Sequence, residues 1–137
     1  MSLFKIFDVA GSAMNAQSVR MNVTASNLAN AGSVSGDPDK VYRLRQPVFE
    51  SFGQQLADQT GVNGVRLQGI VESQAPLEMR YQPSHPEADE KGNVYVSNVN
   101  AVEEMVNMIS ASRSYKNNIE MINTTKELLL QTLSLGR

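Results

Sequence analysis

The sequence predicts a mainly α-helical protein with a small β insert, in which long helices at the two ends of the chain pair antiparallel as a coiled coil around a β-rich module. Both ends repeat apolar residues at alternating steps of four and three, which is typical of a coiled-coil seam. The middle changes to a period of two, which is typical of strands. We expect three parts: a first helix in residues 1–32, a β insert with its linkers in residues 33–97, and a second helix in residues 98–137.

The second helix has the longest helical pattern in the chain, because residues 99–135 contain neither Gly nor Pro. Asn98 and Asn100 offer N-cap oxygens, and Glu103 and Glu104 place carboxylates where the helix dipole favours them. At this length the helix would be about 50 Å long, more than the width of a small globule, so it should protrude or join an assembly. The seam residues predicted here are Met105, Met108, Tyr115, Ile119, Ile122, Leu129 and Leu133.

The first helix repeats the same pattern with unusually small side chains, which permit close approach of another helix. Gly11 lies within the pattern and costs roughly 1 kcal/mol relative to Ala, so this helix should depend on its partners. We expect it to end between Asn27 and Gly32 in a left-handed stop. The seam residues predicted here are Leu3, Phe7, Ala10, Met14, Met21 and Leu28.

The insert is expected to contain several short strands after a loop at residues 33–39. The first strand begins at Lys40, and Pro47 either ends it or makes it an edge strand, because proline has no N–H to donate. Residues 49–59 show no clear pattern. Further strands are predicted at residues 65–72, 77–81 and 94–96.

Composition argues against several classes of function. The net charge is -2 and no Lys/Arg cluster occurs, so we expect no nucleic-acid binding. The chain has no Cys and a single His, His85, which excludes thiolate chemistry and leaves no set of metal ligands. We therefore expect no catalytic residues, no metal, no cofactor and no small-molecule substrate. No apolar run resembles a cleaved signal peptide or a membrane span.

The two ends of the chain carry a family resemblance. Residues 12–17 and 20–31, which read SAMNAQ and RMNVTASNLANA, resemble the N-terminal signature of the bacterial flagellar rod and hook family. Near the second helix, His85 to Asp89, Asn98 to Asn100 and Ala111 to Tyr115 are similar to the same family, and the short insert is similar to that of its proximal rod members.

The resemblance implies a non-enzymatic structural subunit of the flagellar basal body, located in the periplasmic rod and needed for motility. Members of the family leave the cell through the type III export apparatus without a cleaved signal peptide. They polymerise through their terminal helices into a hollow drive shaft that transmits torque and surrounds the export channel. The implied partners are copies of the chain itself, neighbouring proximal and distal rod proteins, and the rod-base adaptor.

Two polar features have both a purely structural and a functional interpretation. The helix end formed by Ser26, Asn27, Leu28, Ala29 and Asn30 is either a simple terminus or a hinge whose amides bond neighbouring backbones. Arg113 is either solvated or pairs with a carboxylate of an adjacent subunit.

Two other functions remain open at the level of the sequence. A soluble adaptor whose helices form a self-contained coiled coil for a single partner would show stable helices in the monomer. An enzyme that works from the β module would need clustered nucleophiles, bases or metal ligands, and the sequence offers none.

Overall fold

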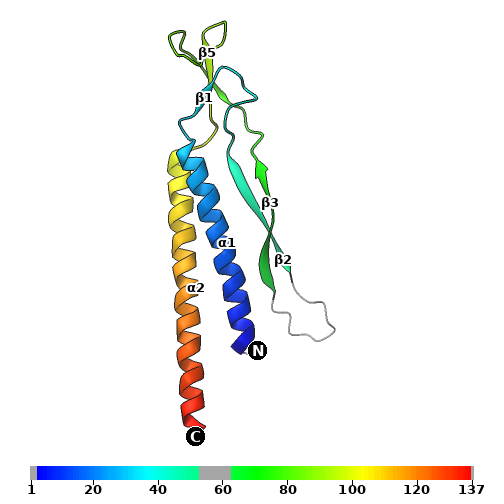
Figure 1. Ribbon diagram of the computed structural model, residues 1–137, viewed down its shortest axis with the longest axis vertical. Helices are drawn as coiled ribbons and strands as arrows, with labels where there is room; N and C mark the ends of the chain where they lie inside the picture. Colours follow the sequence, from blue (N-terminus) through cyan, green and yellow to red (C-terminus); the bar gives the residue numbers. More distant parts are fainter. Residues whose placement is uncertain (1–2, 53–62, 137) are drawn as a thin grey trace.

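The computed structural model of the chain describes residues 3–52 and 63–136. Two long helices, α1 (Leu3–Ala29) and α2 (Ala101–Leu135), lie side by side and antiparallel, so that the start of α1 and the end of α2 are at the same end of the molecule (Figure 1). Small antiparallel sheets lie between them in the sequence. The predicted fold class is confirmed.

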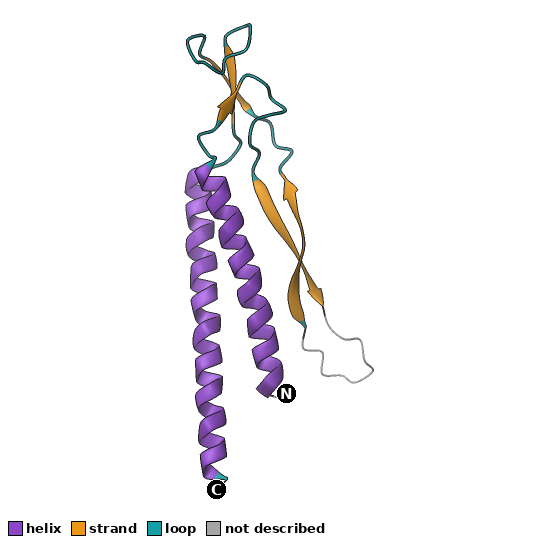
Figure 2. Cartoon of the chain, in the orientation of Figure 1, coloured by secondary structure: helices purple, strands orange, loops and turns teal. Residues whose placement is uncertain are grey.

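The strands form two separate sheets (Figure 2). At the end where the helices meet the insert, β1 (Val34–Ser35), β5 (Asn93–Val96) and β4 (Glu78–Tyr81) form a three-stranded sheet in the order β1-β5-β4. The other two strands, β2 (Arg45–Phe52) and β3 (Gly64–Glu72), pair only with each other and run alongside α1. We call this pair the β2–β3 ribbon.

A bulge interrupts the ribbon, because the register changes from Val48 opposite Gly69 to Phe49 opposite Leu67. Gln68 is the extra residue on β3, and such a bulge increases the local twist. Pro47 lies inside β2, on a strand with only one partner, which is the edge position that the sequence favours.

Three local predictions for the insert and its borders are wrong. The loop predicted at 33–39 contains β1, which pairs with β5. The strand predicted from Lys40 begins at Arg45, because the Leu44 N–H bonds to the side-chain Oδ1 of Asn98 at 2.8 Å instead of to another strand. The left-handed stop predicted for α1 does not form, because Gly92 is the only described residue with a positive φ, at 81°.

The ends of the helices are held by local hydrogen bonds. Asn100 is the N-cap of α2, and its side chain accepts bonds from the N–H groups of Val102 and Glu103. At the end of α1 the N–H of Asn30 bonds to the carbonyls of Ser26 and Asn27, which continues the helical turn without a change of hand.

Two glycines allow close approaches between segments at the three-stranded sheet. Gly92, whose positive φ strains other residues, lies so close to Pro83 and Tyr81 that a Cβ would come within 3.0 Å of Tyr81. At Gly36 a Cβ would lie 2.5 Å from the carbonyl oxygen of Glu87, which shows that the loop after β1 is pressed against the segment before β5.

Few apolar side chains are buried in the described part of the chain. Three of them are alanines, and the largest are valines. A structure with so thin a core has little hydrophobic free energy of its own, so its elements depend on one another and on neighbours. The buried apolar residues are Ala10, Ala16, Val23, Val41, Val94 and Ala111.

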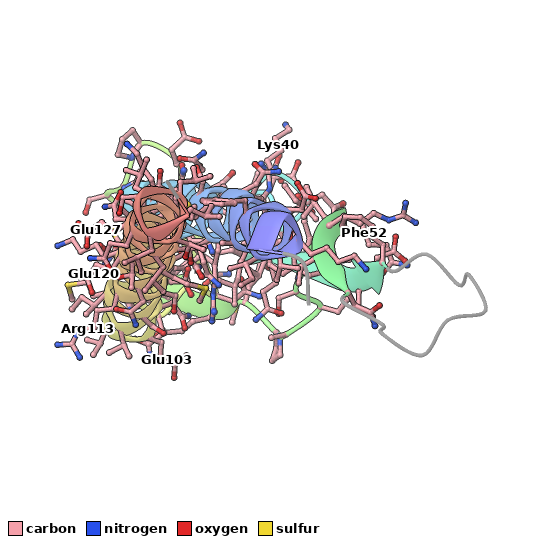
Figure 3. All side chains as sticks on the ribbon, turned by 90° about the horizontal axis from the view of Figure 1, so that it is seen from below. Lys40, Phe52, Glu103, Arg113, Glu120 and Glu127 are labelled. Atoms are coloured by element: carbon pink, nitrogen blue, oxygen red, sulfur yellow. The ribbon has the colours of Figure 1, made fainter. Side chains whose placement is uncertain are left out.

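The elongated part of the molecule has three layers, which Figure 3 shows end-on: α2, then α1, then the β2–β3 ribbon. Among the described elements, α2 packs only against α1, while α1 packs against α2 and both strands of the ribbon. Neither helix, over the residues described, is long and apolar enough to cross a membrane.

Candidate functional site: the helix junction and the open face of α2

Asn27 is the centre of a polar junction between the helices and the insert. It lies in the last turn of α1 and is 1% exposed. Its Nδ2 donates to the carbonyl of Arg45 at 2.8 Å and to Oε2 of Glu104 at 2.7 Å. Its Oδ1 accepts from the hydroxyl of Tyr42 at 2.8 Å and from the N–H of Arg45 at 3.0 Å. The amide thereby uses its full hydrogen-bonding capacity.

These bonds connect α1 to three other parts of the chain. Since both backbone groups of Arg45 bond to one amide, Asn27 takes the place of a neighbouring strand at the first residue of β2. The carboxylate of Glu104 belongs to the first turns of α2, is 6% exposed, and also accepts from Nδ2 of Asn107 at 2.9 Å. The junction therefore sets the ribbon and α2 in place relative to α1.

The surroundings of Tyr42 shift the pKa of its phenol. Burial raises the pKa of the Tyr42 phenol, while the nearby Arg45 guanidinium, 5.2 Å from the ring centroid, acts in the opposite direction. The neutral phenol, which donates to Asn27, is thus the favoured form.

A second set of bonds holds the linkers. Asn98 accepts from the N–H of Leu44 and donates to the carbonyl of Ala75 at 3.1 Å, so one side chain joins the approach to α2 with the segment before β2 and the segment after β3. The N–H of Ser97 bonds to the carbonyl of Ser33, which ties this approach to the segment that follows α1. These bonds prevent the insert from rotating freely about the helix pair.

A cleft of about 420 Å³ opens beside the junction. It contains polar and charged groups but no constellation for acid–base or nucleophilic chemistry. In the described residues, no group of three or more His, Cys, Asp or Glu side chains is arranged to hold a metal. The cleft is lined by Arg20, Thr24, Arg45, Gln46, Pro47, Val48, Phe49, Val71, Glu104 and Asn107.

The predicted seam residues of α1 lie mostly within the layered part of the molecule. Ala10 is buried at 1% exposure, and the side chain of Leu3 lies outside the described residues. The remaining four, which are half-buried, are Phe7, Met14, Met21 and Leu28.

The predicted seam of α2 coincides only partly with the face that packs on α1. The buried residues of α2 are Glu104, Ala111 and Thr125, which follow a heptad spacing one position away from the predicted Met105. Met105 is 49% exposed and Leu133 is 67% exposed. The predicted residues that are half-buried are Met108, Tyr115, Ile119, Ile122 and Leu129. Their role in contacts between subunits stays a prediction.

The remaining predicted polar residues are placed as follows. Ser26 and Ala29 are exposed, and Asn30 donates to the carbonyl of Ser26 at 2.8 Å. Arg113 is exposed and points away from α1 on the outer side of α2 (Figure 3). The hinge and the pairing of Arg113 with a neighbour stay predictions.

The outer side of α2, opposite α1, carries most of the exposed large apolar side chains. Near the helix start they line a shallow groove of about 300 Å³ formed with Ser110, Arg113 and Ser114. The exposed apolar residues of α2 are Val102, Met105, Val106, Ile109, Met121, Leu128, Leu130, Leu133 and Leu135. We call the outer surface formed by Val102, Met105, Val106 and Ile109 the open face of α2.

Comparisons with known proteins agree with this architecture. The profile described as "Flagella basal body rod protein" matches residues 7–36, which include most of α1 and Asn27. The profile described as "Flagellar basal body rod FlgEFG protein C-terminal" matches residues 90–135, which include β5 and α2. Two terminal helices that carry these matches, joined by a short β insert, define the class of flagellar rod proteins.

Relatives that match over their full length show which family of flagellar rod proteins the chain resembles. The chain is 53% identical over 137 residues to the flagellar basal-body rod protein FlgC of Yersinia enterocolitica, with all of both chains covered. It is 50% identical, again with all of both chains covered, to the proteins of that name from Escherichia coli O6:H1 and Salmonella typhimurium. The chain belongs to the FlgC family of flagellar basal-body rod proteins, and it is a non-enzymatic structural subunit of the proximal rod.

Proposed function

We propose that the chain polymerises, with copies of itself and with neighbouring rod proteins, through its two terminal helices into the wall of a hollow shaft. The shaft transmits torque and leaves a channel for export. In this proposal residues 1–32 and 98–137 form the wall, residues 33–97 pack outside it, and the half-buried seam side chains of both helices meet adjacent subunits. The neighbours are proximal and distal rod proteins and the rod-base adaptor, and the type III export apparatus handles the chain during secretion.

The observation that carries this proposal is the open face of α2. Nine large apolar side chains are exposed on one helix, and α1 is the only described element that packs against it. Val102, Val106 and Ile109 follow one another at helical spacing on the outer side, and clustered exposed apolar side chains of this kind mark an interaction site. A self-contained coiled coil for one partner would leave far less of α2 uncovered.

The junction around Asn27 supports the transmission of torque. A shaft is stiff only when its subunits do not bend internally, and the four hydrogen bonds of Asn27 join α1, β2, α2 and the Tyr42 segment at one buried point. Satisfied buried polar networks specify a single arrangement of the elements they join.

The proposal can be tested in a bacterium whose own FlgC protein has been removed. We expect the chain to restore swimming and to be present in isolated basal bodies. A matched variant, Val106→Asp with Ile109→Asp, alters only exposed side chains and should restore neither. Swimming restored by this variant would contradict the role of the open face.

Amide hydrogen exchange on the purified monomer gives an independent test. We expect α1 and α2 to exchange faster than β5 and its neighbours in the three-stranded sheet, because the helices need other subunits to bury their seams. Strong protection along the whole of both helices would instead favour the soluble adaptor.

A further inference from the structure

The β2–β3 ribbon meets α1 with its edges. Asn27 bonds to both backbone groups of Arg45 on β2, and the Ser12 hydroxyl accepts from the N–H of Val65 on β3 at 3.2 Å. In an antiparallel pair, alternate residues direct these backbone groups away from the partner strand, so contacts to them are edge contacts. The faces of the ribbon are therefore covered only in part. On the side that carries Val48 and Val71, the helices approach at the cleft, where Arg20, Thr24, Glu104 and Asn107 are the facing residues, and at Gly64, where a Cβ would lie 3.1 Å from the Ser12 hydroxyl.

One of these faces is apolar at both ends and charged between them. The register places Val71 opposite Gln46, Val48 opposite Gly69, Glu50 opposite Arg66 and Phe52 opposite Gly64, all with side chains on the same side. Arg66 binds Glu50 at 2.6 Å. Phe52 is 45% exposed and Val71 49% exposed. The members of this surface, which we call the Val71 face, are Val48, Glu50, Phe52, Arg66 and Val71.

The Val71 face offers room for a partner, because Val71 and Phe52 on it are 49% and 45% exposed although the ribbon packs on α1. The cleft beside the junction lies at its upper end, since Val48 and Val71 line that cleft together with Arg20 and Thr24 of α1. An element that covers the face can therefore also insert side chains between the ribbon and α1.

The outer side of α2 carries apolar and charged side chains in the same order as the Val71 face. Val102, Val106 and Ile109 follow one another along this side of α2, and Arg113 lies one turn beyond them. From Val102 to Arg113 the helix rises about 16 Å. On the ribbon, the distance along β2 from Gln46, opposite Val71, to Glu50 is about 13 Å. Apolar groups can thus lie against apolar groups while the guanidinium reaches the carboxylate.

The charges are complementary as well. Among the described residues, Arg113 takes part in no ion pair, and Glu50 binds Arg66 through Oε1 alone, which leaves Oε2 for a second cation. In Figure 3 Arg113 lies on the outer side of α2 and Phe52 lies on the ribbon, with α1 between them, so the open face of α2 and the Val71 face of one chain lie on different sides of α1. The partner of each surface must be another molecule.

We propose that the open face of α2 of one copy covers the Val71 face of a second copy, with Val106 and Ile109 against Val48 and Val71, and with Arg113 paired to Glu50. This inference rests on the proposed polymerisation. Since the two surfaces differ and lie on different sides of α1, the contact is head-to-tail, and its repetition produces a ring or a helix instead of a closed dimer.

Photo-cross-linking in assembled basal bodies tests the contact directly. A photoreactive amino acid replaces Ile109, whose side chain is exposed, and mass spectrometry identifies the attached peptide. We expect peptides from β2 or β3 of a second copy. The same substitution at Met79, which is exposed on β4 in the other sheet, should not yield these peptides. Peptides from α2 of a second copy, or from another rod protein alone, would overturn the proposal.

A double-mutant cycle tests the ion pair. Arg113→Gln and Glu50→Gln should each lower the yield of the cross-link roughly fivefold, and the double variant should lower it no further. Glu72→Gln is the matched control, because Glu72 also binds an arginine of the ribbon, Arg45, but lies on the opposite face. Additive effects of the two variants, or an equal effect of the control, would overturn the pairing.

The same samples separate this inference from the proposed function. Basal bodies that contain the chain but show no product between position 109 and the ribbon would overturn the contact and leave the structural role intact. Absence of the chain from basal bodies would overturn the proposed function itself.

Discussion

The two helices differ in how much of their surface the rest of the chain covers. α1 is the middle layer, between α2 and the ribbon, and from Lys5 to Ala29 it has no exposed large apolar side chain. α2 is an outer layer with one covered side and one open side. The buried positions of α1 include two alanines and a valine, which let its neighbours approach closely, while nine large apolar side chains of α2 are exposed. The difference indicates that α1 holds the layers of the monomer together in addition to its place in the shaft wall, whereas the outer side of α2 is available for assembly alone.

The largest effect that this comparison predicts is loss of assembly from the open face of α2. Val106→Asp with Ile109→Asp should leave the circular dichroism of the monomer unchanged, because both side chains are exposed, and should abolish incorporation into rods. The matched change on α1 is Asn22→Asp with Ala25→Asp, also at exposed helical positions, which should incorporate normally. Equal losses from both pairs would remove the distinction between the helices.

The next effect concerns the stability of the monomer. Asn27→Asp removes both donors of the amide and places a second carboxylate against Glu104, which should lower the free energy of unfolding by about 3 kcal/mol. Urea unfolding of the purified chain measures it. Asn30→Asp is the control, because Asn30 makes one exposed bond to Ser26, and its effect should be close to zero. A small effect at Asn27 would mean that the junction does not hold the layers together.

A smaller effect is expected from the covered side of α2. Ala111 is fully buried on the face that packs against α1, so Ala111→Leu should overfill this contact and cost about 2 kcal/mol of unfolding free energy. Ala101→Leu, on an exposed position of the same helix, should change the stability by less than about 0.5 kcal/mol. Thermal unfolding compares the two variants, and similar midpoints would show that α2 has no covered side in solution.

The smallest effect is a dependence on alkaline pH at the junction. Because burial raises the pKa of Tyr42 above that of the unfolded chain, the neutral phenol stabilises the fold fully below about pH 10, and this contribution is lost as pH rises through the folded pKa. Tyr42→Phe should remove that part of the pH dependence and lower stability by about 1 kcal/mol through the lost bond to Asn27. Unfolding curves above and below pH 10 measure both, and an unchanged slope in the variant would contradict this account.

The elements themselves were largely predictable from local patterns. The helical period, the absence of Gly and Pro, and the cap at Asn100 indicate α2 without reference to any other part of the chain. The strands β3, β4 and β5 lie within a residue or two of their predicted positions. The start of β2 was not predictable, because it depends on whether the backbone at Leu44 meets a strand or the side chain of Asn98, which is distant in the sequence.

The side of α2 that faces α1 was harder to predict. The prediction followed the large apolar residues, such as Met105, but the structure buries Ala111 and Thr125 against α1. Close packing of two helices favours small side chains at the contact, so Met108, Ile119 and Ile122 are only half-buried beside it and Met105 is exposed. The apolar residues of α2 belong to two surfaces, the side that packs against α1 and the exposed side. The sequence alone does not show which residue belongs to which surface.

Only part of the candidate site was predictable from the sequence. Asn27 stands out as an amide at a helix end, and Arg113 as a charge on a helix with apolar neighbours. The partners of Asn27, which are Tyr42, Arg45 and Glu104, are joined to it only by the fold. The sequence did not predict the Val71 face as a surface. On this face Val71 and Phe52 share one side of the strands with the charged Glu50 and Arg66, whereas an alternating pattern is normally interpreted as an apolar side that faces the core.

The sequence by itself determined the class of the fold, the helical ends and the family, because periodicity and the terminal signatures are local properties of the chain. The tertiary structure alone decided which side of α2 is covered, that the ribbon meets α1 with its edges, and that the two exposed apolar surfaces lie on different sides of α1. These features depend on how closely layers approach and on which distant polar groups satisfy each backbone edge, and such contacts are defined only when the whole chain is folded.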